Sequence, residues 1–323
     1  KLKNFLEKVK KNGKHKKYDC IVGVSGGVDS CWVLIKAIQL GLRPLAVHMD
    51  NGWNSELAQN NIANIITELK VDLYTYVIDW EEYRECMQAF FDADVIDVEL
   101  LYDNAMQAVN YNLARKFGVK YILSGYNIST EGITFPKCWH WSKYDKRNII
   151  NITKRFSEVS LKTFPAIGTI DRIVFEFLFG IKWTGFLDFL DYNKQDSINY
   201  LKENFGFKPY PYKHYESVFT RFYQGYLLPE KFNVDKRKVH LSSLIMTAQI
   251  SRREAIEDLK KKPYGSEIEL EEDKEYFLKK MNWSPKRLEE YISRPRIEHD
   301  KYASERKFYE LLLRFKNKFL WNL

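Results

Sequence analysis

Cysteine is scarce in this sequence, and its spacing argues against the common cysteine-based zinc sites. The 323 residues contain four cysteines, and no two of them form a Cys-x-x-Cys pair. Because structural zinc ligands usually come in such closely spaced pairs, these cysteines predict no zinc site. Two of the four fall in predicted core elements, where cysteine behaves as a small apolar residue. This usage is typical of a reducing, cytoplasmic protein.

Long hydrophobic runs are also missing. The N-terminal stretch, residues 1–17, is charged and amphipathic, which predicts no secretory signal. The most apolar long segment, residues 173–190, is interrupted by Glu176, Lys182 and Asp188. It is better interpreted as a buried or interfacial helix than as a membrane span. The chain does not begin with Met, so we expect its natural start to lie upstream.

The charge balance is moderately basic. There are 51 Lys and Arg residues against 43 Asp and Glu residues, a formal net charge of +8. Such a balance favours anionic partners such as nucleotides, phosphosugars or nucleic acid. At this modest excess, a solvated basic surface is at least as good an explanation.

The most informative motif is the run Ser25-Gly26-Gly27-Val28-Asp29-Ser30. It lies between a predicted buried strand, residues 20–24, and a predicted helix, residues 31–38. Glycines without a Cβ let the backbone approach an anion, and a helix start offers unpaired N–H groups. Ser25 and Ser30 add hydroxyl donors, and Asp29 can hold a magnesium ion. The alternative is an ordinary glycine turn followed by a helix cap.

The order of elements predicts an α/β fold with a mostly parallel sheet, followed by a helical region. Strands are predicted at residues 20–24, 43–49, 72–78 and 119–123, with helices at 31–38, 54–69, 81–91 and 100–117. Beyond about residue 165 only helices are predicted, at 169–192, 196–205, 216–227, 234–248, 251–261, 267–281, 284–292 and 302–319. We therefore predict a nucleotide domain over residues 1–165 and a helical substrate- or partner-binding domain over residues 166–323.

Polar residues follow two further strands, at the sheet edge where ligands bind in parallel sheets. Asp50 follows the second strand, and the alternative for it is a turn that caps the next helix. Gly125 follows the fourth strand, where a plain turn is equally plausible. His140 lies in an aromatic segment beyond that strand, and it can serve as an acid or base or simply line the site.

The helical region carries a dense group of cations. The candidates for phosphate or carboxylate binding are Lys213, Arg221, Lys236 and Arg237. A solvated basic face is the usual alternative for such a group.

The loop run resembles the PP-loop of the N-type ATP pyrophosphatases. The resemblance implies that ATP is split between its α- and β-phosphates and that AMP is transferred to a substrate oxygen. A Walker P-loop would require Gly-Lys-Ser/Thr, and here Asp29 follows the glycines instead, so γ-phosphoryl transfer is disfavoured.

Four segments together narrow the resemblance. Together they resemble the N-acetyl sugar amidotransferases of O-antigen and flagellin-glycan synthesis. The segments are SGGVDS, HMDNGW, YILSGYN with TEGITFPKCWHW, and KHYESVFTRFYQGYLLPEKFNVDKRKVHLSSLI. The resemblance implies that an acetamido group on a nucleotide-activated sugar becomes an acetamidino group. It also implies ATP and Mg²⁺, a glutaminase partner and a barrel-type subunit that conducts ammonia. Members usually begin with a cysteine-rich zinc-binding stretch, so zinc would require an N-terminal segment that is not part of this sequence.

The resemblance also assigns roles to residues. Gly26, Gly27 and Ser30 would hold pyrophosphate, with Ser25 at the loop entrance and Asp29 on the metal or β-phosphate. His48, Asp50 and Gly125 would contact the adenosine. The sugar nucleotide would lie against Lys213, Arg221, Lys236, Arg237 and His140.

Two other functions remain open. A PP-loop tRNA-modifying enzyme would fit the basic charge, but an RNA-binding extension and paired cysteines are not visible, so we expect no nucleic acid partner. A catalytically silent scaffold that keeps the nucleotide fold is disfavoured by the intact loop. The sequence does not identify the sugar, the acetamido position or the oligomeric state.

Overall fold

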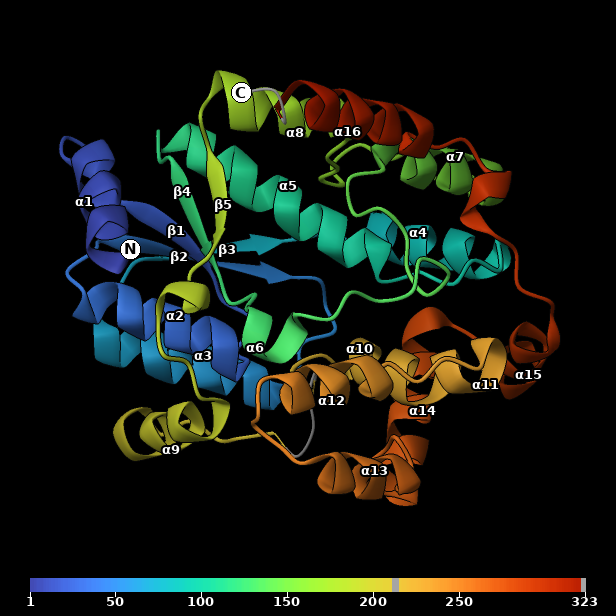
Figure 1. Ribbon diagram of the computed structural model, residues 1–323. Coiled ribbons are helices and arrows are strands. Elements are labelled where there is room, and N and C mark those ends of the chain that lie inside the picture. The colour runs from blue at the N-terminus through green and yellow to red at the C-terminus, as the bar shows by residue number, and fades with distance from the viewer. Residues whose placement is uncertain (211–214, 321–323) are drawn as a thin grey trace.

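A five-stranded parallel sheet forms the centre of the protein (Figure 1). The computed structural model describes residues 1–210 and 215–320. The strands are β1 (Cys20–Gly23), β2 (Pro44–Asp50), β3 (Leu73–Val77), β4 (Tyr121–Ser124) and β5 (Lys182–Gly185). Their order is β3-β2-β1-β4-β5, and each neighbouring pair is parallel. The strand order reverses between β1 and β4, the position where ligands bind in open α/β sheets.

Alternation along the strands places apolar side chains on both faces of the sheet. Ile21 on β1 pairs with Leu45 on β2, and both belong to one buried cluster. The next pair, Val22 and Ala46, belongs to the cluster on the opposite face. Successive side chains of a strand point to opposite faces, so a sheet buried on both sides needs a continuous apolar run. The α/β class predicted from the strand and helix pattern is confirmed.

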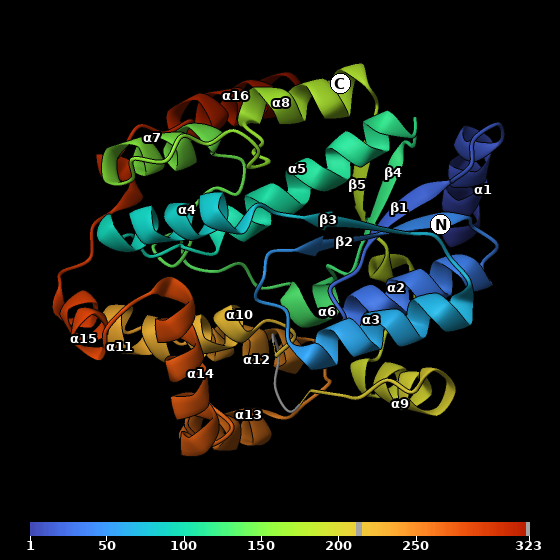
Figure 2. The same ribbon diagram turned by 180° about the vertical axis from the view of Figure 1, so that it is seen from behind.

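Helices lie over both faces of the sheet, and others extend away from it. They are α1 (Leu2–Gly13), α2 (Val28–Gln39), α3 (Glu56–Leu69), α4 (Trp80–Asp92), α5 (Leu100–Lys116), α6 (Ile128–Glu131), α7 (Lys146–Phe156), α8 (Thr169–Ile173), η1 (Val174–Leu178), η2 (Leu187–Phe189), α9 (Lys194–Phe205), α10 (Val218–Phe222), η3 (Tyr223–Leu227), α11 (Leu228–Phe232), α12 (Arg237–Met246), α13 (Arg252–Lys260), α14 (Glu267–Met281), α15 (Pro285–Ser293), η4 (His299–Lys301) and α16 (Arg306–Leu320). One face is covered by α2 and α3, with α9 beyond them, and the other by α4 and α5 (Figures 1 and 2).

The C-terminal helices share a core with the sheet. Trp53, directly after β2, is fully buried. Its ring centroid lies 5.5 Å from that of Phe219 on α10 and 6.1 Å from that of Phe277 on α14. The N–H group of Val218 donates to the Trp53 carbonyl oxygen at 2.9 Å. These rings belong to the cluster that also packs under α4 and α5, so α10 and α14 are fixed against the end of β2.

The structure corrects one predicted element and adds another. Residues 169–192 were expected to be one helix, and instead they form α8, η1, β5 and η2. β5 is a short strand that pairs in parallel with β4 at the sheet edge, so strands do not stop at residue 165. The helix α7 was not anticipated. The division into domains at residue 165 remains a prediction.

Among the described residues, no helix is both long and apolar enough to cross a membrane.

Candidate functional site

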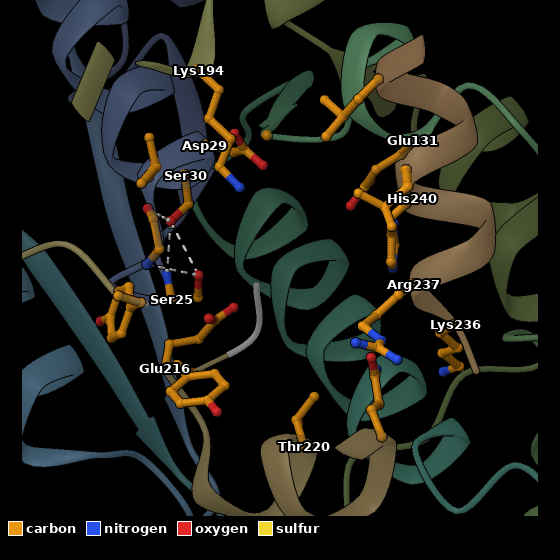
Figure 3. Close-up of a pocket in the computed structure, with 18 of the residues that line it drawn as sticks. Ser25, Asp29, Ser30, Glu131, Lys194, Glu216, Thr220, Lys236, Arg237 and His240 are labelled. Atoms are coloured by element: carbon orange, nitrogen blue, oxygen red, sulfur yellow. Dashed lines mark hydrogen bonds between the residues drawn. The ribbon is translucent and has the colours of Figure 1, made fainter. Parts of the chain in front are cut away.

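The loop predicted to bind phosphate, residues 25–30, is called the phosphate loop and joins the end of β1 to the first turn of α2 (Figure 3). Gly26 has φ +81, and a Cβ at this position would lie 2.7 Å from the carbonyl oxygen of Ala58. Only glycine fits both the left-handed backbone and the close approach. Gly27 is the N-cap of α2 and has no side chain to cap it. The N–H groups of the first turn are therefore directed at an anion that enters the loop.

The two serines form hydrogen bonds within the loop. The Ser30 hydroxyl group donates to the Gly27 carbonyl oxygen at 3.0 Å and accepts from the Ser25 N–H group at 3.2 Å. The Gly27 N–H group donates to the Ser25 oxygen at 3.3 Å. These hydroxyl groups are local hydrogen-bonding groups that a phosphate oxygen can engage instead.

Two adjoining cavities lie beside the phosphate loop. The larger has a volume of about 800 Å³ and the smaller about 380 Å³. The predicted site residues that line the larger cavity are Ser25, Gly27, Asp29, Ser30, Gly125, Arg221, Lys236 and Arg237. Those that line the smaller cavity are Ser25, His140 and Lys236. In Figure 3 the loop residues form one wall, and Lys236, Arg237 and His240 face them from the other. The fold thus brings together residues more than 200 positions apart.

The ends of β1 and β4 meet at Gly125. A Cβ on Gly125 would lie 3.0 Å from the carbonyl carbon of Asp29 and from the Ser30 nitrogen. Gly125 thus permits the end of β4 to pack tightly against the start of α2. Asp29 itself accepts a hydrogen bond from the Tyr192 hydroxyl group.

His48 and Asp50, both within the described part of the chain, line neither cavity. His48 is buried, and its Nδ1 atom donates to the Val24 carbonyl oxygen at 2.9 Å. The Asn54 amide lies 3.1 Å from His48 Nε2 and donates to Asp50 at 3.1 Å. Asp50 also accepts from the Gly52 N–H group at 2.9 Å, which is the turn-type alternative. Their contact with adenosine stays a prediction.

The predicted substrate-binding cations are engaged with carboxylates. Lys236 Nζ lies 2.5 Å from Glu99 Oε2, and Arg237 lies 2.7 Å from Asp235. Arg221 contacts Asp273 through two nitrogens, each at 2.5 Å. Sequence patterning had suggested free cations, but these carboxylates neutralise most of their charge. A contact with an anionic sugar nucleotide therefore stays a prediction for all three.

His140 is half-buried on the wall of the smaller cavity. Its Nδ1 atom donates to the Pro136 carbonyl oxygen at 3.1 Å. Burial is the main cause that lowers the pKa of His140 below its ordinary value, so the ring is neutral at pH 7 with Nε2 able to accept. Lys213, the remaining predicted cation, lies outside the described residues.

Sequence reasoning missed Glu216. Its carboxylate lines both cavities, and a Cβ on Gly27 would lie 3.5 Å from Glu216 Oε1. The backbone is held by an isolated bridge between Asn54 and Ser217, and the Ser55 N–H group donates to the Glu216 carbonyl oxygen at 3.0 Å. Nothing in the local sequence signals this placement, because the contact joins segments more than 150 residues apart.

The donor set fits ATP with Mg²⁺. Asp29 and Glu216 bring two carboxylates to the loop, and Mg²⁺ prefers oxygen ligands. Within residues 1–210 and 215–320 no group of three or more His, Cys, Asp or Glu side chains could hold a metal by itself. Mg²⁺ usually takes one or two carboxylates and completes its shell with phosphate oxygens and water. The residues present thus suit a metal that arrives with a nucleotide.

Residues 216–318 match the family model described as LPS biosynthesis protein WbpG-like, C-terminal domain. The match covers about a third of the chain, and Glu216 is its first residue. No curated protein matches the chain.

Several solved structures are distantly similar. Glutamine-dependent NAD⁺ synthetase from Acinetobacter baumannii matches with 20% identity and a TM-score of 0.32, over 40% of this chain and only 24% of the synthetase. NH₃-dependent NAD synthetase from Campylobacter jejuni matches with 13% identity and a TM-score of 0.36, over 79% and 93% of the two chains. NMN synthetase from Francisella tularensis matches with 14% identity and a TM-score of 0.32, over 63% and 93%. These TM-scores are low and indicate no more than a distant likeness.

Proposed function

We propose, from a phosphate loop that shares its cavity with a WbpG-like C-terminal domain, that this chain is an ATP-dependent amidotransferase of lipopolysaccharide or flagellin-glycan biosynthesis. It would convert an acetamido group of a nucleotide-activated, acidic sugar to an acetamidino group, in the cytoplasm. The observation that carries the proposal is the position of Glu216. This first residue of the matched domain lies against Gly27 of the loop.

The proposed reaction first converts the acetamido oxygen into a good leaving group. An amide oxygen is a poor leaving group, and transfer of AMP to it makes it a good one. The acetamido carbonyl oxygen attacks the α-phosphorus of ATP, and the bond to the β-phosphate oxygen breaks to release pyrophosphate. Ammonia then adds to the activated carbon, AMP departs with the former acetamido oxygen, and the nitrogen loses its extra protons. The loop contains no lysine, which supports cleavage at the α-phosphorus over γ-phosphoryl transfer.

The phosphate loop would hold the departing pyrophosphate. It offers the N–H groups at the start of α2 and the hydroxyl groups of Ser25 and Ser30 as donors. Such preorganised donors stabilise charge that develops on the leaving oxygen. Mg²⁺, when bound through Asp29 and Glu216, would neutralise part of the phosphate charge.

The adjoining cavities have room for the second substrate. Together with the loop they offer a continuous lining that includes Glu131, Thr220 and Lys236. Holding both reactants in one enclosed space supplies orientation and limits hydrolysis of the adenylate. As partners we propose a glutaminase subunit and a barrel-type subunit that conducts ammonia, because neutral ammonia would otherwise be scarce at neutral pH.

The test is product analysis with and without Asp29. Candidate nucleotide-activated acetamido sugars are incubated with ATP, Mg²⁺ and ammonium, and the sugar is examined by mass spectrometry. We expect a product about one mass unit lighter, as oxygen is replaced by NH, with one pyrophosphate per product. Asp29→Ala should abolish pyrophosphate release. Asp196→Asn, which changes an exposed acid on α9, is the matched control.

A tRNA-modifying enzyme is the main alternative, on the strength of the basic charge alone. Steep salt-dependent RNA binding, with no sugar product, would favour it. A silent scaffold would bind ATP yet fail to exchange labelled pyrophosphate into ATP when the sugar is present.

A further inference from the structure

Tyr192 contacts the one acidic side chain of the phosphate loop. It is only 7% exposed, and its hydroxyl group donates to Asp29 Oδ1. A carboxylate oxygen only accepts, so the tyrosine must be the donor.

The position of Tyr192 is set from outside the phosphate loop. The next residue, Asn193, caps α9 by accepting from the N–H groups of Gln195 and Asp196 at 2.9 and 3.1 Å. The helix α9 is anchored on α2 through Tyr200, whose ring centroid lies 5.3 Å from that of Trp32. Tyr192 also belongs to the buried cluster around α2. The donor is thus held in place by contacts outside the phosphate loop.

The far end of the same segment also contacts the loop, but at its backbone. The Tyr210 hydroxyl group donates to the Gly26 carbonyl oxygen at 3.0 Å and accepts from Asn61 at 3.3 Å. Two tyrosines on either side of α9 therefore contact the phosphate loop in different ways. One contacts the side chain proposed to bind metal, and the other contacts only the main chain.

We propose that Tyr192 is a positioning residue that selects the side-chain rotamer of Asp29 and presents its second carboxylate oxygen, Oδ2, to Mg²⁺ bound with ATP. The inference rests on the proposed use of Asp29 as a metal ligand. Loss of this hydrogen bond removes one constraint on the Asp29 side chain, and the affinity for the metal then falls. A hydrogen bond to a charged group is strong enough for a change of ~10-fold in metal affinity.

The test compares three conservative variants. Mn²⁺ affinity is measured by electron paramagnetic resonance in the presence of α,β-methylene-ATP, and thermal denaturation is recorded for each variant. Tyr192→Phe should weaken Mn²⁺ binding ~10-fold, with maximal turnover largely restored at saturating metal. Tyr210→Phe and Tyr200→Phe, which remove hydroxyl groups from the same segment, should leave Mn²⁺ affinity within about twofold.

A double variant separates positioning from general damage. In the Asp29→Asn background, Tyr192→Phe should cause no further loss of Mn²⁺ affinity, because the ligand it orients is already gone. Wild-type affinity in Tyr192→Phe, equal losses in all three tyrosine variants, or a wild-type protein whose nucleotide site binds no Mn²⁺ would each overturn the inference. A wild type that binds Mn²⁺ with nucleotide yet makes no amidino product would instead refute the proposed function.

Discussion

The Ser30 hydroxyl group and the Gly27 carbonyl oxygen are 3.0 Å apart, so a side chain from the first turn of α2 spans the phosphate loop. The Ser30 hydroxyl oxygen in turn accepts from the Ser25 N–H group at 3.2 Å. A single hydroxyl group therefore supports the shape of the loop, and its proton is one that a bound phosphate oxygen could accept.

Ser30→Ala should weaken ATP binding more than it weakens the fold. The change removes one donor to phosphate and the hydrogen bonds of this hydroxyl group to Gly27 and Ser25, and we expect the lost donor to cost about 1.5 kcal/mol of binding, or about 10-fold in Kd. Isothermal titration with ATP and Mg²⁺ checks this. Ser242→Ala, on the exposed side of α12, is the control. Unchanged affinity in Ser30→Ala would contradict the role of this hydroxyl group.

Gly26→Ala should be much more damaging than Gly180→Ala. Both glycines have positive φ, +81 and +63. An alanine in this left-handed backbone should lower the free energy of unfolding of both variants by about 1–2 kcal/mol. At Gly26 the new Cβ would also lie 2.7 Å from the Ala58 carbonyl oxygen, whereas nothing lies within 4 Å at Gly180. Urea denaturation should therefore show a larger decrease in the free energy of unfolding for Gly26→Ala than for Gly180→Ala. Gly26→Ala should also lose ATP binding. Equal losses would mean that the loop moves to accommodate the methyl group.

Lys236 and Glu99 should behave as a coupled pair. Their side chains are 12% and 10% exposed, and Gln224 also donates to Glu99 at 2.8 Å. Lys236→Met leaves a nearly buried carboxylate without its cation, at a cost of about 3 kcal/mol in the free energy of unfolding. The double variant Lys236→Met/Glu99→Gln should recover at least half of that loss, as measured by urea denaturation.

The same double variant tests whether Lys236 also contacts the substrate. With stability restored, a raised KM for the sugar nucleotide would indicate that the ammonium group binds it directly. An unchanged KM would assign Lys236 to the fold and not to recognition.

Stability should fall in mild acid because of His299. This ring is buried, stacks on Trp141 at 4.9 Å, and its Nδ1 atom donates to Asn148 at 2.8 Å. Burial lowers the pKa of His299 to about 3, whereas in the unfolded chain it is about 6.5. Below pH 6.5 the unfolded chain binds a proton that the folded protein does not. The free energy of unfolding should thus fall by up to about 1.4 kcal/mol per pH unit between pH 6.5 and 3.

The control for this pH dependence is His299→Gln, which cannot take up the proton. Urea denaturation at pH 7, 6 and 5 should give a steeper decline for the wild type than for the variant. Parallel declines would assign the acid sensitivity to other groups.

Local sequence was sufficient for most of the sheet and for the phosphate loop. The apolar run at residues 20–24 predicts a buried strand, and the helix expected at residues 54–69 is present as α3, which Ser55 caps by accepting from the Ala58 N–H group. These features depend on neighbours within a few residues, so a pattern in the chain is enough to reveal them.

Features that depend on distant partners could not be predicted. β5 consists of Lys182-Trp183-Thr184-Gly185, which has no strand-like alternation of its own and exists because β4 offers an open edge. The partners of the cations were hidden for the same reason, since Arg221 and Asp273 are 52 residues apart. The structure adds carboxylate partners to these cations, and their role in binding an anionic substrate stays a prediction.

The burial of Trp53 beneath α10 and α14 limits how this protein can be divided. A fragment that stops before residue 216 would leave the indole ring in water, next to the newly uncovered aromatic surface of α4. We expect such a fragment to aggregate rather than to survive as a minimal ATP-binding module, and co-expression of the missing half to restore its solubility.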